Sequence, residues 1–137
     1  MNEGGHVELM NYIRLLSMLG MAAILAGCGG GSNLSTVTGT VTMDGAPVEA
    51  ASVAFTPEEG SQSFGVTDAS GHYELYFAGD TKGAVTGKHT VRITTPSPSE
   101  DDPRQYVQIP ARYNTETELT ATVEKGSNTI DFALKSE

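Results

Sequence analysis

The region from residue 35 to residue 137 is dominated by short runs in which apolar and polar residues alternate, and this pattern constrains the fold more than any other feature. Successive side chains of a β-strand point to opposite faces, so alternation predicts strands with one buried and one solvated face. In residues 35–43, Val37, Val41 and Met43 fall on one face and threonines on the other. No run here has the spacing of an amphipathic helix. We therefore expect this region to be nearly all β.

Turn residues divide this region into seven expected strands. Residues 72–77 are the strongest of them, with Tyr73, Leu75 and Phe77 assigned to the core. Seven short strands with frequent turns predict a seven-stranded antiparallel Greek-key β-sandwich, with a closed barrel as the alternative. The expected strands cover residues 35–43, 51–56, 64–67, 72–77, 87–94, 119–123 and 129–134.

Three glycines mark positions where the backbone is expected to be unusual. Gly45 follows Asp44 and supplies a tight turn, because glycine takes positive φ at little cost. Gly71 closes a second turn, in which the carboxylate of Asp68 can accept hydrogen bonds from backbone amides. Gly39 falls on the inward face of its strand, which predicts a bulge or a close approach of another backbone segment.

Two segments are expected to be loops and to form the contact surfaces of the domain. The first is residues 78–86. The second is residues 95–110, which contain four prolines and the acidic run Glu100-Asp101-Asp102 and should be long and solvated.

The first 27 residues have the features of a secretory leader. The apolar run of residues 15–25 is too short to span a bilayer as a helix but suits the apolar part of a signal peptide, preceding the domain as a short helix. The residues ahead of it carry Glu3, Glu8 and a single strong cation, Arg14, which is poor for the start of a leader. We therefore predict translation from Met10, which N-terminal sequencing of the unprocessed precursor tests.

The leader ends in Leu25-Ala26-Gly27-Cys28, which resembles the bacterial lipobox. The resemblance implies cleavage between Gly27 and Cys28 and acylation of Cys28, whose two or three acyl chains would hold the protein on a membrane. The alternative is an ordinary signal peptide with a chance cysteine. The absence of Asp at position 29 favours the outer membrane over inner-membrane retention. Residues 28–34 are glycine-rich and are expected to form a flexible tether between the membrane and the domain of residues 35–137.

The charge of the chain excludes one class of partner. The formal net charge is −9, and the lysines and arginines are scattered along the sequence rather than clustered. Because nucleic-acid binding requires a concentrated basic face, we expect no nucleic-acid partner.

Several motifs together resemble the carboxypeptidase regulatory-like domain. They are Asp44-Gly45-Ala46-Pro47-Val48, Ala51-Ser52-Val53-Ala54-Phe55, Thr67-Asp68-Ala69-Ser70-Gly71-His72-Tyr73, Gly87-Lys88-His89-Thr90-Val91 and Asp131-Phe132-Ala133-Leu134. The resemblance covers residues 37–134 and implies a transthyretin-like sandwich with an accessory, folding or binding role. Joined to the lipobox, the whole is similar to small planctomycete-type lipoproteins.

Candidate catalytic and metal-binding groups are few in the sequence. Cys28 cannot act as a thiolate if it is acylated, which leaves only His72 and His89 of the mature chain as histidine bases. His72 and Glu74 share one strand face but make only half a zinc site, and Asp68 and Asp80 lack the carboxylate spacing of a calcium loop. We therefore expect no enzyme activity, no metal and no cofactor.

Three tyrosines, Tyr76, Tyr106 and Tyr113, are the candidate ligand surface, because flat aromatic rings can stack on sugars; the alternative is packing at the rim of the sandwich.

The expected function is that of a lipid-anchored, non-enzymatic β-sandwich with structural or recognition roles in the bacterial cell envelope. Its expected location is the outer membrane, the periplasm or the cell surface. Its partners would be the membrane, through Cys28, and an envelope protein or glycan. The alternatives are a carbohydrate-binding module and, less favoured, an accessory domain of a hydrolase.

Overall fold

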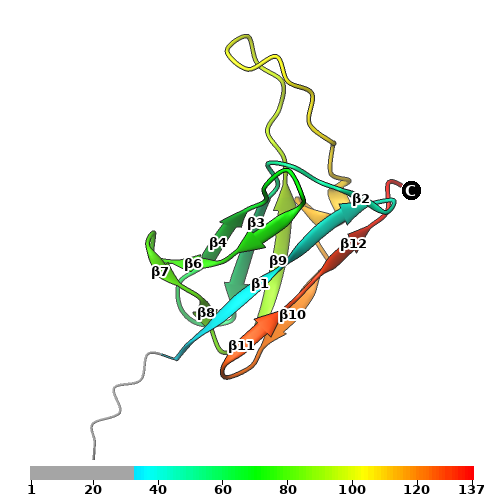
Figure 1. Cartoon of the computed structure of the whole chain (residues 1–137). Helices are drawn as coiled ribbons and strands as arrows, with labels where there is room; N and C mark the ends of the chain where they lie inside the picture. The colour runs from blue at the N-terminus through cyan, green and yellow to red at the C-terminus, as the bar shows by residue number, and fades with distance from the viewer. Residues whose placement is uncertain (1–32) are drawn as a thin grey trace, which may run out of the picture. The chain divides into compact units, whose positions relative to one another are not determined.

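The computed structural model describes residues 33–137, so the leader, the cleavage site between Gly27 and Cys28, and most of the expected tether lie outside the described residues. The described part is an all-β sandwich of two packed sheets, as the alternating pattern predicts (Figure 1). Its one helical segment is the short 3-10 helix η1 (Ala111–Tyr113). Among residues 33–137 there is no helix with the length and apolar character needed to span a membrane.

The first sheet is built around one long strand, β1 (Leu34–Met43). On one edge β1 pairs antiparallel with three short segments, and on the other edge it pairs parallel with the last two strands of the chain. These partners are β2 (Ala46–Pro47), β5 (His72–Glu74), β8 (Ala84–Val85), β11 (Ser127–Thr129) and β12 (Phe132–Leu134).

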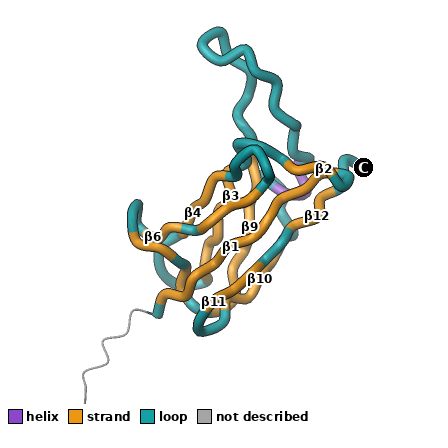
Figure 2. The backbone as a smooth tube through the Cα atoms, in the orientation of Figure 1, coloured by secondary structure: helices purple, strands orange, loops and turns teal. Residues whose placement is uncertain are grey.

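The second sheet is antiparallel throughout, in the order β10-β9-β3-β4-β6-β7. Its centre is the pair β3 and β9, which stays in register over six residues. Figure 2 shows the two layers of strands and the long loop that leaves them after β9. The strands are β3 (Ser52–Pro57), β4 (Ser63–Val66), β6 (Tyr76–Phe77), β7 (Thr81–Lys82), β9 (Gly87–Thr94) and β10 (Thr120–Val123).

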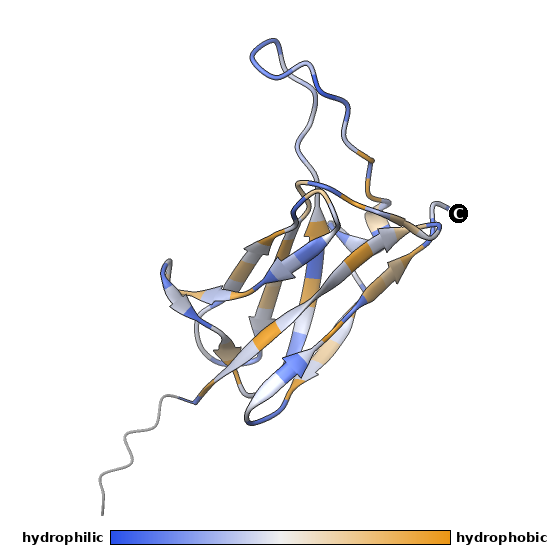
Figure 3. Ribbon diagram, in the orientation of Figure 1, coloured by the Kyte–Doolittle hydropathy of each residue, from blue (hydrophilic) through white to orange (hydrophobic). Residues whose placement is uncertain are grey.

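The core lies between the sheets and consists mainly of the alternate apolar residues of β1, β3, β9 and β12 (Figure 3). Phe132 of the first sheet packs against Phe55 and Tyr73, with ring centroids 6.1 and 6.3 Å apart. Tyr73 and Leu75 are buried as expected, whereas Phe77 is only half-buried. Each fully buried side chain of this size stabilises the fold by about 1.5–3 kcal/mol, so the inward faces account for most of the stability.

The strand pairing differs in two ways from the expected seven antiparallel strands. Residues 72–77 change sheets, because β5 pairs with β1 and β6 pairs with β4, with Leu75 between them. The chain also crosses from β10 in the second sheet to β11 in the first, and it then runs parallel to β1. The side-chain period is the same whichever partner a strand has, so alternation alone predicts the strands but not their neighbours.

The expected loop of residues 78–86 is instead tied into both sheets. β7 pairs with β6, and β8 pairs with Leu34 and Ser35 at the start of β1. Glycine makes this possible, because a Cβ at Gly83, whose φ is 116°, would lie 2.6 Å from the carbonyl oxygen of Ser35. The segment is therefore part of the end of the sandwich at which β1 begins.

The two ends of the sandwich differ in what they carry. β1 and β9 both begin near β8, so Thr94 at the end of β9 lies at the opposite end from Leu34. The loop of residues 95–110 projects from that opposite end (Figure 1). The backbone oxygen of Asn33 accepts a hydrogen bond of 2.9 Å from Thr86, so the described chain enters the sandwich one or two residues before the expected domain start.

Candidate functional site

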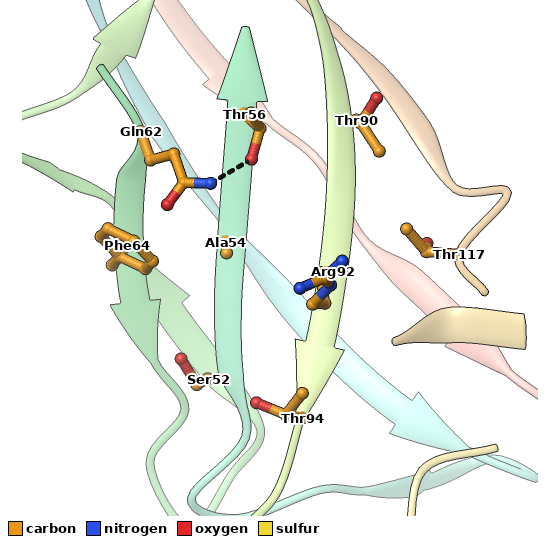
Figure 4. Close-up of a pocket in the computed structure, with 9 residues that line it drawn as sticks. All are labelled: Ser52, Ala54, Thr56, Gln62, Phe64, Thr90, Arg92, Thr94 and Thr117. Atoms are coloured by element: carbon orange, nitrogen blue, oxygen red, sulfur yellow. Dashed lines mark hydrogen bonds between the residues drawn. The ribbon is translucent and has the colours of Figure 1, made fainter. Parts of the chain in front are cut away.

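The outer face of the second sheet carries a groove of about 440 Å³, which we call the β3 groove (Figure 4). It runs over the outward side chains of β3, β4 and β9. The residues that line it are Ser52, Ala54, Thr56, Gln62, Phe64, Thr90, Arg92, Thr94 and Thr117.

The strand register explains why the face is hollow. Ala54 pairs directly with Phe64 on one side and with Arg92 on the other, so the three residues form a row across three strands. Strands lie about 4.8 Å apart, which places the backbones at Phe64 and Arg92 about 10 Å from each other. Ala54 has only a methyl side chain, so the space between the phenyl ring and the guanidinium stays open.

Phe64 faces solvent because the opposite face of β4 has no room for a large side chain. A Cβ at Gly65 would lie 2.4 Å from the carbonyl oxygen of Glu74, where β5 crosses closely behind the strand. Ser63 and Gly65 therefore point inward, and Phe64 and Val66 are 49% and 65% exposed. Of these two residues only Phe64 lines the β3 groove, and an exposed aromatic ring beside a hollow is a feature of binding surfaces.

Only some of the polar groups that line the β3 groove form hydrogen bonds within residues 33–137. The Nε of Arg92 donates to the carbonyl oxygen of Asn114 at 3.0 Å, and the amide of Gln62 donates to the hydroxyl of Thr56 at 2.7 Å. Within residues 33–137, Arg92 forms no ion pair, and the hydroxyls of Ser52 and Thr94 make no hydrogen bond to protein. The lining holds one cation and no carboxylate, in a chain whose net charge is −9.

The three candidate tyrosines lie on three separate elements. Tyr76 is on β6, where its hydroxyl donates to Glu74 at 3.2 Å. Tyr106 is in the loop of residues 95–110, and Tyr113 is in η1. None of them lines the β3 groove.

Arginines cover one ring face of two of these tyrosines. The guanidinium of Arg104 lies 5.3 Å from the ring of Tyr106 and pairs with Asp102, whose carboxylate also accepts from the Tyr106 hydroxyl at 2.8 Å. These bonds hold the pKa of Asp102 well below its usual range, with Arg104 the largest cause. Arg112 lies 4.8 Å from the ring of Tyr113 and lowers the pKa of its hydroxyl. One ring face of Tyr106 and one of Tyr113 are thus already occupied.

The two histidines of this region are in different sheets and different environments. His72 is exposed on β5, whereas His89 on β9 is 1% exposed and packs on Phe55 with centroids 5.5 Å apart. The Nε2 of His89 lies 2.6 Å from the carbonyl oxygen of Val85, so this nitrogen carries the proton, and Nδ1 is buried with no hydrogen-bond partner among the described residues. His89 is a core residue.

The carboxylates considered for metal binding have other partners. Glu74 pairs with Lys82 at 3.1 Å, and this ion pair is the main reason that the pKa of Glu74 is lowered. Asp68 accepts from the backbone amides of Ser70 and His72 at 2.9 and 3.0 Å, and Gly71 has a φ of 79°. The predicted turn is confirmed, and its hydrogen bonds occupy the carboxylate of Asp68. Among residues 33–137 no three histidine, cysteine or acidic side chains gather in a way that could hold a metal.

The β3 groove was not predicted from the sequence, where tyrosines and loops were the candidate surfaces. The groove depends on the register that brings Ala54, Phe64 and Arg92 together. The one local signal was the order of residues in β4, where Phe64 and Val66 alternate with Ser63 and Gly65. In that run the small residues are the buried ones.

Comparison with known proteins does not assign the chain to a family. No family model matches the chain, and no curated protein matches it. Among solved structures, the chain is similar to a DUF3823 family protein from Parabacteroides merdae, with a TM-score of 0.36 and 16% sequence identity. The match covers 71% of this chain and 43% of that one, so the chain spans less than half the length of its structural neighbour.

Proposed function

We propose that this protein is a lipid-anchored β-sandwich of the bacterial cell envelope that presents a recognition surface and catalyses no reaction. The observation that carries the proposal is the position of β1: it begins at Leu34, the last residue of the expected tether, at the end of the sandwich opposite the loop of residues 95–110. A domain held by its Leu34 end turns its long loop away from the membrane and leaves its sheet faces open to partners.

The length of the tether sets the distance from the membrane. Five peptide units separate Cys28 from Asn33, and a fully extended chain of that length spans about 18 Å. Two or more acyl chains on Cys28 would hold the protein on the bilayer essentially permanently. The end formed by β8, β11 and the start of β1 would then stay close to the lipid surface.

The described side chains support a binding role over a catalytic one. His72 and His89 lie in different sheets, and the imidazole of His89 is enclosed in the core. The resemblance to the carboxypeptidase regulatory-like domain points the same way, because that domain has an accessory or binding role beside catalytic domains. Its turn motif, Asp68 to Tyr73, is accounted for here by hydrogen bonds within the turn and by packing.

Metabolic labelling with a fatty-acid analogue tests the anchor. The native chain should incorporate the label and sediment with membranes, whereas Cys28→Ser should do neither. Ser32→Ala, a change within the tether, is the matched control and should behave as the native chain. Equal labelling of the native chain and Cys28→Ser would contradict the proposal.

A further inference from the structure

We propose that the β3 groove binds an acidic glycan, that is, a chain of pyranose sugars bearing carboxylate or sulfate groups. This inference rests on the proposed recognition role and gives it a ligand class, but it does not depend on the lipid anchor. Three independent features of the groove support it: an apolar ring, a cation with no ion pair among residues 33–137, and a row of hydroxyls.

The apolar feature is Phe64. Its side chain is 49% exposed and stands beside Ala54, which leaves a flat apolar surface next to a hollow (Figure 4). The ring cannot be placed in the core by a shift of register, because Gly65 must face Glu74. Each pyranose ring has a face of C–H groups that can cover such a surface, and the space of about 10 Å across three strands fits one sugar ring between Phe64 and Arg92.

The charged feature is Arg92. Its Nε is held by the carbonyl oxygen of Asn114, so the two terminal nitrogens are left to donate to a ligand. A guanidinium pairs through two parallel hydrogen bonds with a carboxylate or a sulfate, and this geometry favours an anion over a neutral hydroxyl. The groove contains no acidic side chain that would compete for the cation.

The polar feature is the row of hydroxyls on both sides of Ala54. Ser52 and Thr94 lie at one end of the groove, and Thr56 and Thr90 lie at the other. The amide oxygen of Gln62 adds an acceptor, since only its nitrogen is bonded to Thr56. A ligand rich in hydroxyl groups can exchange hydrogen bonds with such a surface along its length, which a hydrocarbon or a lipid tail cannot do.

The charge balance favours a glycan over a nucleic acid, although both combine sugars with anions. A nucleic acid carries a phosphate on every residue and binds through many cations, whereas this groove offers one. The net charge of −9 would repel such a dense polyanion. An acidic glycan needs to place only one anionic group at Arg92 while its neighbouring sugars contact Phe64 and the hydroxyls.

Calorimetric titration of the full chain in detergent tests the proposal with three probes of equal length: an oligogalacturonate, a sulfated galactose oligomer and a neutral galactose oligomer. Either acidic probe, or both, should bind at least about ten-fold more tightly than the neutral one, a ratio that corresponds to about 1.4 kcal/mol. Binding of the uronate alone would identify carboxylate as the anion, and binding of the sulfated probe alone would identify sulfate.

Two variants and two matched controls locate the site. Arg92→Gln should remove the preference for the acidic probe, and Phe64→Ala should weaken binding of every probe by about ten-fold. Val66→Ala changes an exposed apolar residue on the same strand outside the groove, and Lys88→Gln removes a cation from the same strand as Arg92; both should bind as the native chain. Thermal unfolding confirms that each variant is folded.

The proposal fails if neither acidic probe binds, if the neutral probe binds equally well, or if Arg92→Gln leaves the preference intact. It also fails if the native chain forms a dimer that Phe64→Ala dissociates, because the face would then be an interface between two copies. If glycan binding fails while Cys28 is labelled normally, only the glycan proposal is contradicted. If labelling is lost while glycan binding is intact, only the lipid anchor is contradicted.

Discussion

The outer faces of both sheets carry serine or threonine side chains, but the two faces differ in whether these side chains are hydrogen-bonded within the protein. On β1 the outward residues are threonines, and Thr40 donates from its amide and its hydroxyl to the carboxylate of Asp131, at 2.8 and 3.0 Å. On the second sheet the hydroxyls of Ser52 and Thr94 have no bond to the described protein, and Phe64 is half-exposed. The outward hydroxyl of Thr40 on β1 is therefore bonded within the protein, whereas some of those on the second sheet have no partner among residues 33–137.

The inner side of β1 is closely packed against the C-terminal segment. β1 has partners along both edges, and the carbonyl of Ile130 passes close to Gly39 while accepting a hydrogen bond from the hydroxyl of Tyr73 at 2.5 Å. The close approach expected at Gly39 is confirmed. We therefore expect substitutions around β1 to change folding stability and substitutions in the β3 groove to change binding.

Gly39→Ala should have the largest effect on stability. Its Cβ would lie 1.8 Å from the carbonyl oxygen of Ile130, so the backbone of β1 or of the C-terminal segment must move. We expect a loss of at least about 3 kcal/mol in the free energy of unfolding, measured by chemical denaturation. Gly126→Ala is the control: its φ of 106° strains the new residue by about 1–2 kcal/mol, but nothing lies within 4 Å. Equal losses would contradict the close approach.

Tyr73→Phe should have the next largest effect. It removes a buried hydroxyl and leaves the carbonyl of Ile130 without that donor, at a cost of about 1–2 kcal/mol. Burial raises the pKa of Tyr73 above its ordinary value of 10.0, so the stabilisation by the native hydroxyl is lost as the pH rises beyond that value. The difference between native and variant unfolding free energies should shrink at high pH. A constant difference would show that the hydroxyl is not buried.

Asp68→Asn tests the turn that joins the two sheets. Hydrogen bonds from Ser70, and then from His72, lower the pKa of Asp68 below 3.8. The stabilisation by this carboxylate is therefore present above pH 3.8 and is lost as the pH falls through the folded-state pKa. Thermal unfolding of the native chain should show a loss of stability in that acidic range that is smaller in Asp68→Asn.

The same substitution made on both sheets should give a sharp contrast, with the smallest of the expected effects at Val66. Val66→Thr, on the exposed face of β4, should change the free energy of unfolding by less than about 0.5 kcal/mol. Val41→Thr, at a fully buried position of β1, should cost about 1–3 kcal/mol, because a hydroxyl replaces a methyl group in the core. Similar losses at both positions would remove the distinction between the two regions.

Much of the fold was predictable because its signals are local. The alternation in residues 35–43 predicted β1 and its buried face, and Asp44-Gly45 forms the expected tight turn, with both residues at positive φ. The change of sheet within residues 72–77 was not predictable, since the same alternation persists while the hydrogen-bonding partner changes.

The groove was less predictable than the strands because it is a property of register. Ala54, Phe64 and Arg92 are far apart in the sequence, and only pairing of β3 with both β4 and β9 brings them into one row. The exposed Phe64 also runs against the expectation that the larger apolar residues of a strand face the core. The space behind Gly65 decides the orientation, and that space is set by another segment, at Glu74.

The most direct test of the division between the two faces is an amide chemical-shift titration of the isotope-labelled full chain in detergent with an oligogalacturonate. We expect shifts at Ala54, Phe64 and Arg92 and their outward neighbours, while the amides of Thr36 to Thr42 on β1 stay unchanged. Shifts centred on β1 or on the loop around Tyr106, with none at Ala54, would contradict the division between the two faces.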